Sequence, residues 1–169
     1  MHACPAATTP ALHSPHRTPA VLHLLLPVKH LADVVYGARY ARRLQQWGIA
    51  VRVSLLHVQP ASKHHERYQG APAGAATDAA SEQLMHEAGL YLQRSHIDFS
   101  AYLFSGELAF TILDTAELLA CHEIVLPARR RAAWQRHLRT DLAGTLARDS
   151  RSATVVLAGQ DGVGGAVTL

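Results

Sequence analysis

The stretch AVLHLLLPV, residues 20–28, decides how the rest of the chain is interpreted. A continuous apolar run of this length is typical of a strand that is covered by helices on both faces. From Leu31 to Leu44, apolar residues then recur at helical spacing, and Gly48 follows in a C-terminal capping position. Residues 49–58, IAVRVSLLHV, form a second run that is rich in β-branched residues. This part of the chain therefore predicts a strand, a helix and a second strand.

The same alternation continues to the end of the chain. Three further strands are expected at 98–104, 123–128 and 153–159, and each follows a segment with apolar residues at helical spacing. The order predicts an α/β fold with a five-stranded parallel sheet, doubly wound and Rossmann-like, with helices on both faces. Ligands of such folds bind beyond the carboxyl ends of the strands, where the strand order reverses. The first and fourth strands are expected to flank that point, with their exits at Lys29 and Arg129.

Length and composition indicate one globular domain. The chain has 169 residues, of which 49% are hydrophobic and 17% charged, and its net charge is +3. We expect a disordered tail at 1–18, a folded domain at 19–159 and a flexible tail at 160–169 whose end could add a short edge strand. The positive excess is small and concentrated in one segment, and a diffuse nucleic-acid-binding protein would normally carry more, so nucleic acid is not the expected partner. No apolar run is long enough to span a membrane. Two cysteines make no disulfide framework, which favours a reducing, cytoplasmic location.

The excess positive charge gathers after the fourth strand. Residues 123–141, EIVLPARRRAAWQRHLRTD, contain five arginines and a histidine. The interpretation that we favour is a solvated basic loop followed by a helical turn. A sharper hypothesis is that Arg129, Arg130 and Arg131, together with Lys29, grip a phosphate or an acidic partner bidentately.

Several segments together resemble the universal stress protein family. They are LLLPVKH, SLLHVQP at 54–60, SGELAFTILDTAELLACHEIVLPA and the closing TVVLA. Their order and spacing match the family across roughly residues 20–158. The resemblance implies the adenine-nucleotide alpha hydrolase-like fold, a regulatory or protective role in a stress response that is exerted by binding, and a homodimer.

The resemblance fails at the family's ATP site. Nucleotide-binding members carry Gly-x2-Gly-x9-Gly-Ser/Thr after strand four, and here the three glycines fall on Pro127, Arg130 and Thr140 and the Ser/Thr on Asp141. The family's aspartate at the end of strand one is Lys29. Proline has no N–H to offer a phosphate, and an aspartate at a helix N-terminus repels one. We therefore predict no cofactor, and we expect a degenerate nucleotide site that can still attract an anion at Lys29, Val58, Arg129, Arg130, Arg131, Thr140 and Asp141.

Metal binding and catalysis find little support in the sequence. There are twelve histidines, but the stretch His64-His65-Glu66 fits no zinc motif. No Gly-x-Ser-x-Gly is present, and Cys121 lies late on an amphipathic helix, where packing is its expected role. We accordingly assign no catalytic residue and no metal ligand, and we expect His57 to be structural.

Partners remain open between several possibilities. The stretch Ala153–Gly159 is β-branched and uncharged and would otherwise be an exposed sheet edge, so we expect it to form a homodimer. One alternative is an enzyme or sensor that reads a nucleotide through the arginine-rich loop. The other is an electrostatic adaptor that docks an acidic protein or nucleic acid on residues 129–139.

Overall fold

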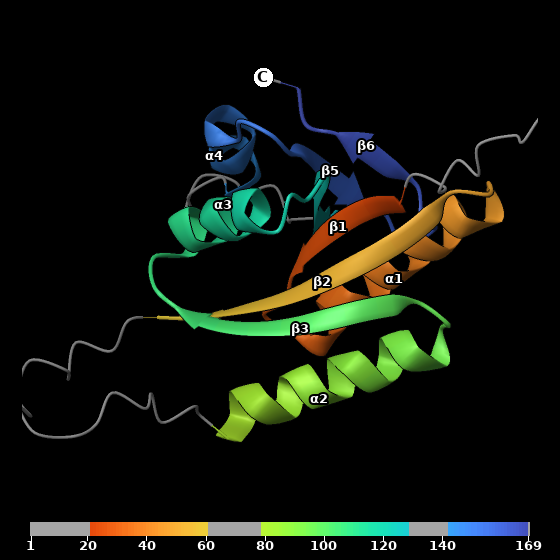
Figure 1. Cartoon of the computed structure of the whole chain (residues 1–169), viewed down its shortest axis with the longest axis horizontal. Helices are drawn as coiled ribbons and strands as arrows, with labels where there is room; N and C mark the ends of the chain where they lie inside the picture. The colour runs from red at the N-terminus through yellow and green to blue at the C-terminus, as the bar shows by residue number, and fades with distance from the viewer. Residues whose placement is uncertain (1–20, 61–78, 129–141, 169) are drawn as a thin grey trace, which may run out of the picture.

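The structure is a computed structural model that describes residues 21–60, 79–128 and 142–168. These residues form an α/β fold, as the sequence predicts, and strands and helices alternate until β5 (Figure 1). In chain order the elements are β1 (Val21–Pro27), α1 (Leu31–Gln46), β2 (Ala50–Gln59), α2 (Ala79–Arg94), β3 (Asp98–Ser105), α3 (Leu108–Leu118), β4 (Glu123–Pro127), α4 (Leu142–Asp149), β5 (Thr154–Ala158) and β6 (Gly164–Ala166).

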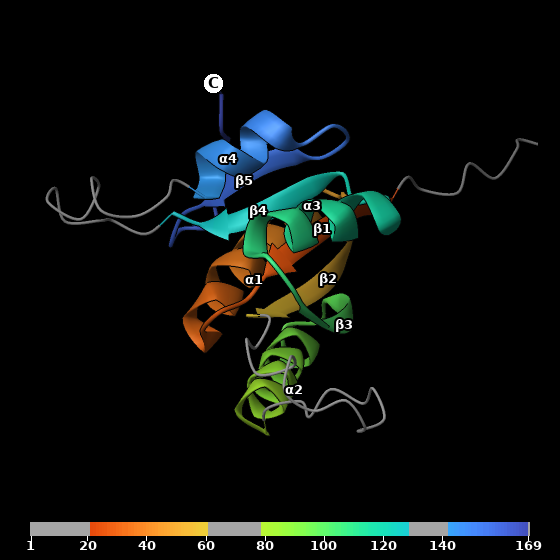
Figure 2. The same cartoon turned by 90° about the vertical axis from the view of Figure 1, so that its left-hand side faces the viewer.

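The strands lie in the order β3-β2-β1-β4-β5-β6. All neighbouring pairs are parallel except β5 and β6, which are antiparallel. Helices α1 and α2 lie on one side of the sheet and α3 and α4 on the other, as Figure 2 shows. The chain runs outward from β1 to β3 and then crosses back to β4, so the strand order reverses between β1 and β4. The predicted doubly wound sheet is therefore confirmed, and its switch point lies where the sequence places it.

Two cores explain the continuous apolar run of β1. Leu24, Leu25 and Leu26 are each at most 1% exposed. Leu24 and Leu26 belong to the cluster under α1 and α2, whereas Leu25 belongs to the cluster under α3 and α4. Because successive side chains of a strand point to opposite faces, a strand that is covered twice must be apolar at every position.

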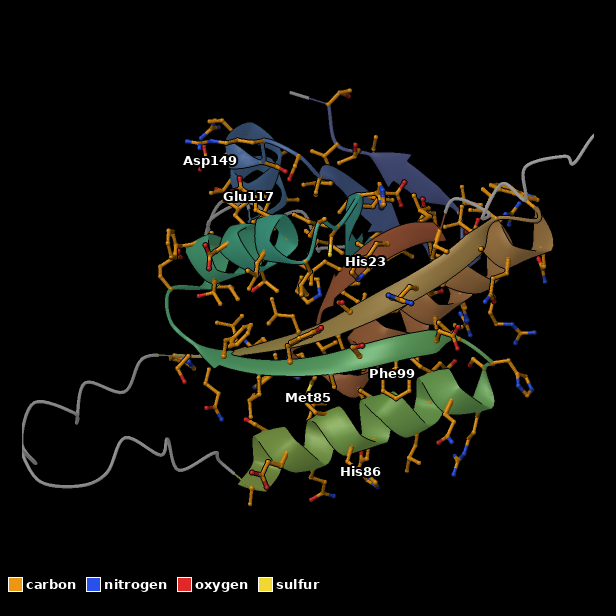
Figure 3. All side chains as sticks on the ribbon, in the orientation of Figure 1. His23, Met85, His86, Phe99, Glu117 and Asp149 are labelled. Carbon is orange, nitrogen blue, oxygen red and sulfur yellow. The ribbon has the colours of Figure 1, made fainter. Side chains whose placement is uncertain are left out.

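The first core extends under α2 to the edge of the sheet. Met85 of α2 and Phe99 of β3 lie between the helix and the sheet, while His86 points away from both (Figure 3).

None of the helices in the described parts of the chain has the length and apolarity needed to cross a membrane.

A sixth strand is the main difference from the predicted five. It is β6, and it lies within residues 160–169, which were expected to be a flexible tail with at most a short edge strand at the end. Val156, Leu157 and Ala158 of β5 pair with Ala166, Gly165 and Gly164 of β6. The expectation that β5 is an exposed sheet edge is therefore wrong for these three residues.

Candidate ligand cleft at the switch point

A cleft of about 440 Å³ opens at the carboxyl ends of β1, β2 and β4, beside the N-termini of α3 and α4. This is the place at which doubly wound sheets bind ligands. Its described walls consist of Pro27, Val28, Lys29, Asp33, Leu56, His57, Val58, Pro60, Gly106, Leu108, Ile112, Leu126, Pro127 and Leu142.

The described walls are mainly apolar. Of their fourteen residues, only Lys29, Asp33 and His57 carry ionisable side chains. A cleft of this kind suits the apolar part of a small molecule, with a few polar groups to orient it. Asp33 and His57 already form hydrogen bonds within the chain, and these bonds limit what the two side chains can offer to a ligand.

Asp33 caps the N-terminus of α1 through a capping box. Its Oδ2 accepts hydrogen bonds from the backbone N–H of Lys29 at 3.0 Å and of His30 at 2.8 Å. The side chain is only 5% exposed. A carboxylate in the first turn complements the positive end of the helix dipole. Two amides at the exit of β1 are therefore used within the chain.

Glu107 caps the N-terminus of α3. Its carboxylate accepts hydrogen bonds from the backbone N–H groups of Ala109 at 3.1 Å and Phe110 at 2.7 Å. The bond from Phe110 lowers the pKa of Glu107 most, and the bond from Ala109 adds to it. Its neighbours Gly106 and Leu108 line the cleft. The two helix N-termini that are fully described beside the cleft are thus both capped by carboxylates of the chain itself.

His57 holds three elements together. Its Nδ1 lies 2.7 Å from the carbonyl oxygen of Val28, and its Nε2 lies 3.1 Å from Oγ of Ser81. Because a carbonyl can only accept, Nδ1 carries a proton and donates, and Nε2 is paired with the Ser81 hydroxyl. The ring therefore ties β2 to the end of β1 and to the first turn of α2, the structural role expected for it.

A serine and a histidine at hydrogen-bonding distance can also form a nucleophile and its base. Here Ser81 is buried and is not part of the cleft wall, so a substrate in the cleft does not meet its hydroxyl. Cys121 is also buried, and burial raises the pKa of its thiol to about 11, which keeps it protonated.

The structure brings together the predicted site residues that it describes. Lys29 and Val58 both line the cleft. Arg129, Arg130, Arg131, Thr140 and Asp141 lie outside the described residues. Pro127 and Leu142, which lie on either side of that segment in the sequence, are both in the cleft wall.

Sequence reasoning missed Asp33 and Glu107. The signal for Asp33 was an acid at the third position after His30, the spacing of a capping box.

No group of three His, Cys, Asp or Glu side chains within 21–60, 79–128 and 142–168 could hold a metal ion. The stretch His64-His65-Glu66 lies outside those ranges.

Comparison with known proteins gives a match in structure only. No protein-family model and no curated protein sequence matches the chain. A hypothetical protein solved as a test case of structural genomics has a TM-score of 0.60 and 16% identity, over 82% of this chain and 95% of its own. A universal stress protein in complex with cAMP has a TM-score of 0.56 and 11% identity, over 81% and 97%.

A universal stress protein family member from Arabidopsis thaliana with AMP bound has a TM-score of 0.54 and 12% identity, over 82% of this chain and 91% of its own. One from Archaeoglobus fulgidus has a TM-score of 0.54 and 14% identity, over 81% and 93%. At these identities the likeness concerns the fold. The chain therefore has the fold of the universal stress proteins, as the sequence predicts.

Proposed function

We propose that this chain is a member of the universal stress protein family that acts by binding, without catalysis, in a regulatory or protective role during stress. Its cleft takes a small, mainly apolar ligand and does not hold ATP through backbone amides. The fold and the order of the family-like segments support the membership. The fold itself hosts many functions, so the activity has to be argued from the cleft.

The capping of the two helix N-termini is the observation that carries this proposal. Phosphates bind at helix N-termini because free backbone N–H groups point at them and the dipole favours negative charge. Beside this cleft, the amides of Lys29 and His30 already donate to Asp33, and those of Ala109 and Phe110 already donate to Glu107. The Asp33 carboxylate also places a negative charge in the cleft wall, and Glu107 places one beside the cleft, which disfavours a triphosphate electrostatically.

The chemistry of the cleft wall supports a role in binding. Both nitrogens of the His57 ring are engaged, one with the Val28 carbonyl and one with the Ser81 hydroxyl. A general base needs a free nitrogen within reach of the substrate proton. With Cys121 protonated and buried, the described wall offers no activated nucleophile.

Isothermal titration calorimetry with ATP, AMP, cAMP and pyrophosphate tests the proposal. We expect no ATP binding at micromolar concentration and no phosphate release from ATP. The double variant Asp33→Ala/Glu107→Ala, which frees four amides, is expected to gain affinity for pyrophosphate. The variant Glu87→Ala, which removes an exposed carboxylate on α2, is the matched control and should not. Micromolar ATP binding by the unaltered chain would contradict the proposal.

A nucleotide held through its base is the second candidate function. It is favoured by the neighbours solved with cAMP and with AMP and by the apolar walls, which suit a flat ring. Lys29 and the arginines at 129–131 would then supply the charge for the phosphate. Binding of AMP or cAMP that weakens at least tenfold in Lys29→Ala, with ATP inactive, would favour this function over the first.

The remaining parts of the proposal concern partners and location. An acidic protein partner would use residues 129–139, and its binding should weaken steeply with salt. We place the protein in the cytoplasm because it uses few cysteines and keeps Cys121 as a free thiol. The homodimer predicted through Ala153–Gly159 depends on the edge of β5, where β6 is now paired.

A further inference from the structure

The solvent-facing side of α1 is basic along its second half. Arg39 and Arg42 are exposed there, and Arg43 is half-buried. The one acidic residue within α1 is Asp33, which is buried in the first turn of the helix. This side of α1 therefore presents three positive charges to solvent, and no carboxylate of the helix itself offsets them.

Two of the arginines are held in place by the turn between β5 and β6. Nη1 of Arg39 donates to the carbonyl of Gln160 at 2.7 Å, and Nη1 of Arg43 donates to the carbonyl of Asp161 at 3.3 Å. The Asp161 carboxylate accepts the backbone N–H of Val163 at 3.0 Å, so it is used within its own turn. A guanidinium has further N–H donors besides Nη1, and a side chain that is already fixed loses less entropy when it binds an anion.

An exposed tryptophan ends the same side of the helix. Trp47, the C-cap of α1, stands one turn after Arg43 and two turns after Arg39, so the three side chains share one face. The guanidinium carbon of Arg43 lies 5.4 Å from the centroid of the indole ring, which is a cation–π contact. Trp47 is 65% exposed, so most of its ring does not cover the chain's own core and is accessible to a partner.

We propose that this side of α1, from Arg39 to Trp47, binds single-stranded nucleic acid. The arginines contact the phosphates of the strand, and the exposed indole stacks on one of its bases. The surface is separate from the cleft, because α1 begins at the carboxyl end of β1 and ends before the amino end of β2, so that Trp47 lies at the opposite end of the sheet. The inference can therefore fail while the proposed function stands, and the reverse.

The combination of side chains favours nucleic acid over an acidic protein. A carboxylate pairs with an arginine but makes no use of an indole, whereas a nucleotide offers a phosphate to the guanidinium and a flat ring to the indole. Single strands have bases free to stack on an aromatic side chain, and a duplex does not. The net charge of +3 argues against a diffuse binder of nucleic acid. The surface proposed here is confined to one helix and contacts only a few phosphates.

Tryptophan fluorescence tests the stacking. The chain has two tryptophans, so Trp134→Phe leaves Trp47 as the only one that emits. We titrate this variant with oligouridylate, with the duplex that oligouridylate forms with its complement, and with polyglutamate. Uridine is chosen so that no adenine competes for the cleft. We expect saturable quenching by the single strand and none by the duplex or by polyglutamate, and oligothymidylate then shows whether DNA binds as well as RNA.

The salt dependence of binding separates charge from stacking. For single strands, each phosphate contact contributes about −0.7 to the slope of log K against log salt concentration. Measured by fluorescence anisotropy of labelled oligouridylate, Arg42→Ala should flatten the slope by about 0.7 and weaken binding severalfold. Arg148→Ala, which removes an exposed arginine of α4, is the matched control and should change neither. Trp47→Ala should weaken binding about tenfold and leave the slope unchanged, because a stacked base carries no charge.

Three results would overturn the inference. The first is oligouridylate that does not bind at low salt, or that binds Arg42→Ala and Trp47→Ala as tightly as the unaltered chain. The second is quenching by polyglutamate that equals quenching by the single strand, which would assign the surface to an acidic protein. The third is binding that is lost in Arg129→Ala/Arg130→Ala/Arg131→Ala and kept in both α1 variants. Circular dichroism and a cooperative urea transition establish that each variant is folded.

Discussion

Replacing Asp33 with alanine tests the central feature of the cleft. Asp33 accepts two hydrogen bonds from backbone amides and is 5% exposed, so water cannot readily take its place. A hydrogen bond to a charged group contributes about 1.5–3 kcal/mol, and part of this returns as the freed amides rehydrate. We therefore expect Asp33→Ala to lower the free energy of unfolding by about 2–4 kcal/mol.

Glu107→Ala is the matched comparison, since Glu107 also caps a helix through two amides but lies at the surface. Its amides rehydrate at once, so the expected loss is only about 0.5–1 kcal/mol. Urea unfolding followed by circular dichroism at equal m-values measures both. If Asp33→Ala cost no more than Glu107→Ala, the buried carboxylate would not be holding the exit of β1, and the argument against a phosphate there would lose its basis. Asp33→Asn, which keeps one acceptor oxygen, should fall between them.

Three further outcomes follow from the packing and the titrating groups. The folded-state pKa of Glu107 lies below its ordinary value of 4.5. The Glu107 carboxylate therefore stabilises the fold fully above pH 4.5, and this stabilisation is lost as the pH falls through the folded-state pKa. The difference in free energy of unfolding between the unaltered chain and Glu107→Gln should accordingly be present at neutral pH and disappear on acidification. With a pKa of about 11, the Cys121 thiol should be roughly one part in a thousand thiolate at pH 8 and resist alkylation in a Cys4→Ser background until urea unfolds the chain. Gly37→Ala should cost about 1–2 kcal/mol despite the better helix propensity of alanine, because its Cβ would lie 2.4 Å from Cδ1 of the buried Leu26; a denaturation curve that shows stabilisation would contradict this.

The part of the fold that could be predicted is the part whose signal is local. The apolar runs of β1, β2 and β4 and the helical spacing in α1 and α3 lie within single segments, and together they fixed the sheet and its switch point. β6 could not be predicted as clearly as the other strands, because its sequence, Gly-Gly-Ala, has neither an apolar pattern nor β-branched residues. Its position comes from contacts with α1 and β5, which only the folded chain brings together.

The sequence predicts where the cleft lies, but it does not predict which side chains form hydrogen bonds there. Lys29 and Val58 were expected at the switch point, and both line the cleft there. Periodicity says where a strand ends, yet it does not say which carboxylate will turn back to the amides at that end. Asp33 stands four residues after Lys29, and the chain has to form the first turn of α1 before its side chain can reach the Lys29 amide.

The caps of α1 and α3 link the stability of the chain to the proposed binding properties of the cleft. A helix N-terminus beside a cleft leaves N–H groups that need a partner, and in a nucleotide-binding protein the ligand can supply it. Here Asp33 supplies a partner to the His30 amide, and Glu107 supplies partners to the amides of Ala109 and Phe110, without a ligand. The same reasoning explains why freeing the two caps should both destabilise the chain and create affinity for pyrophosphate: the two effects share one cause and must appear together.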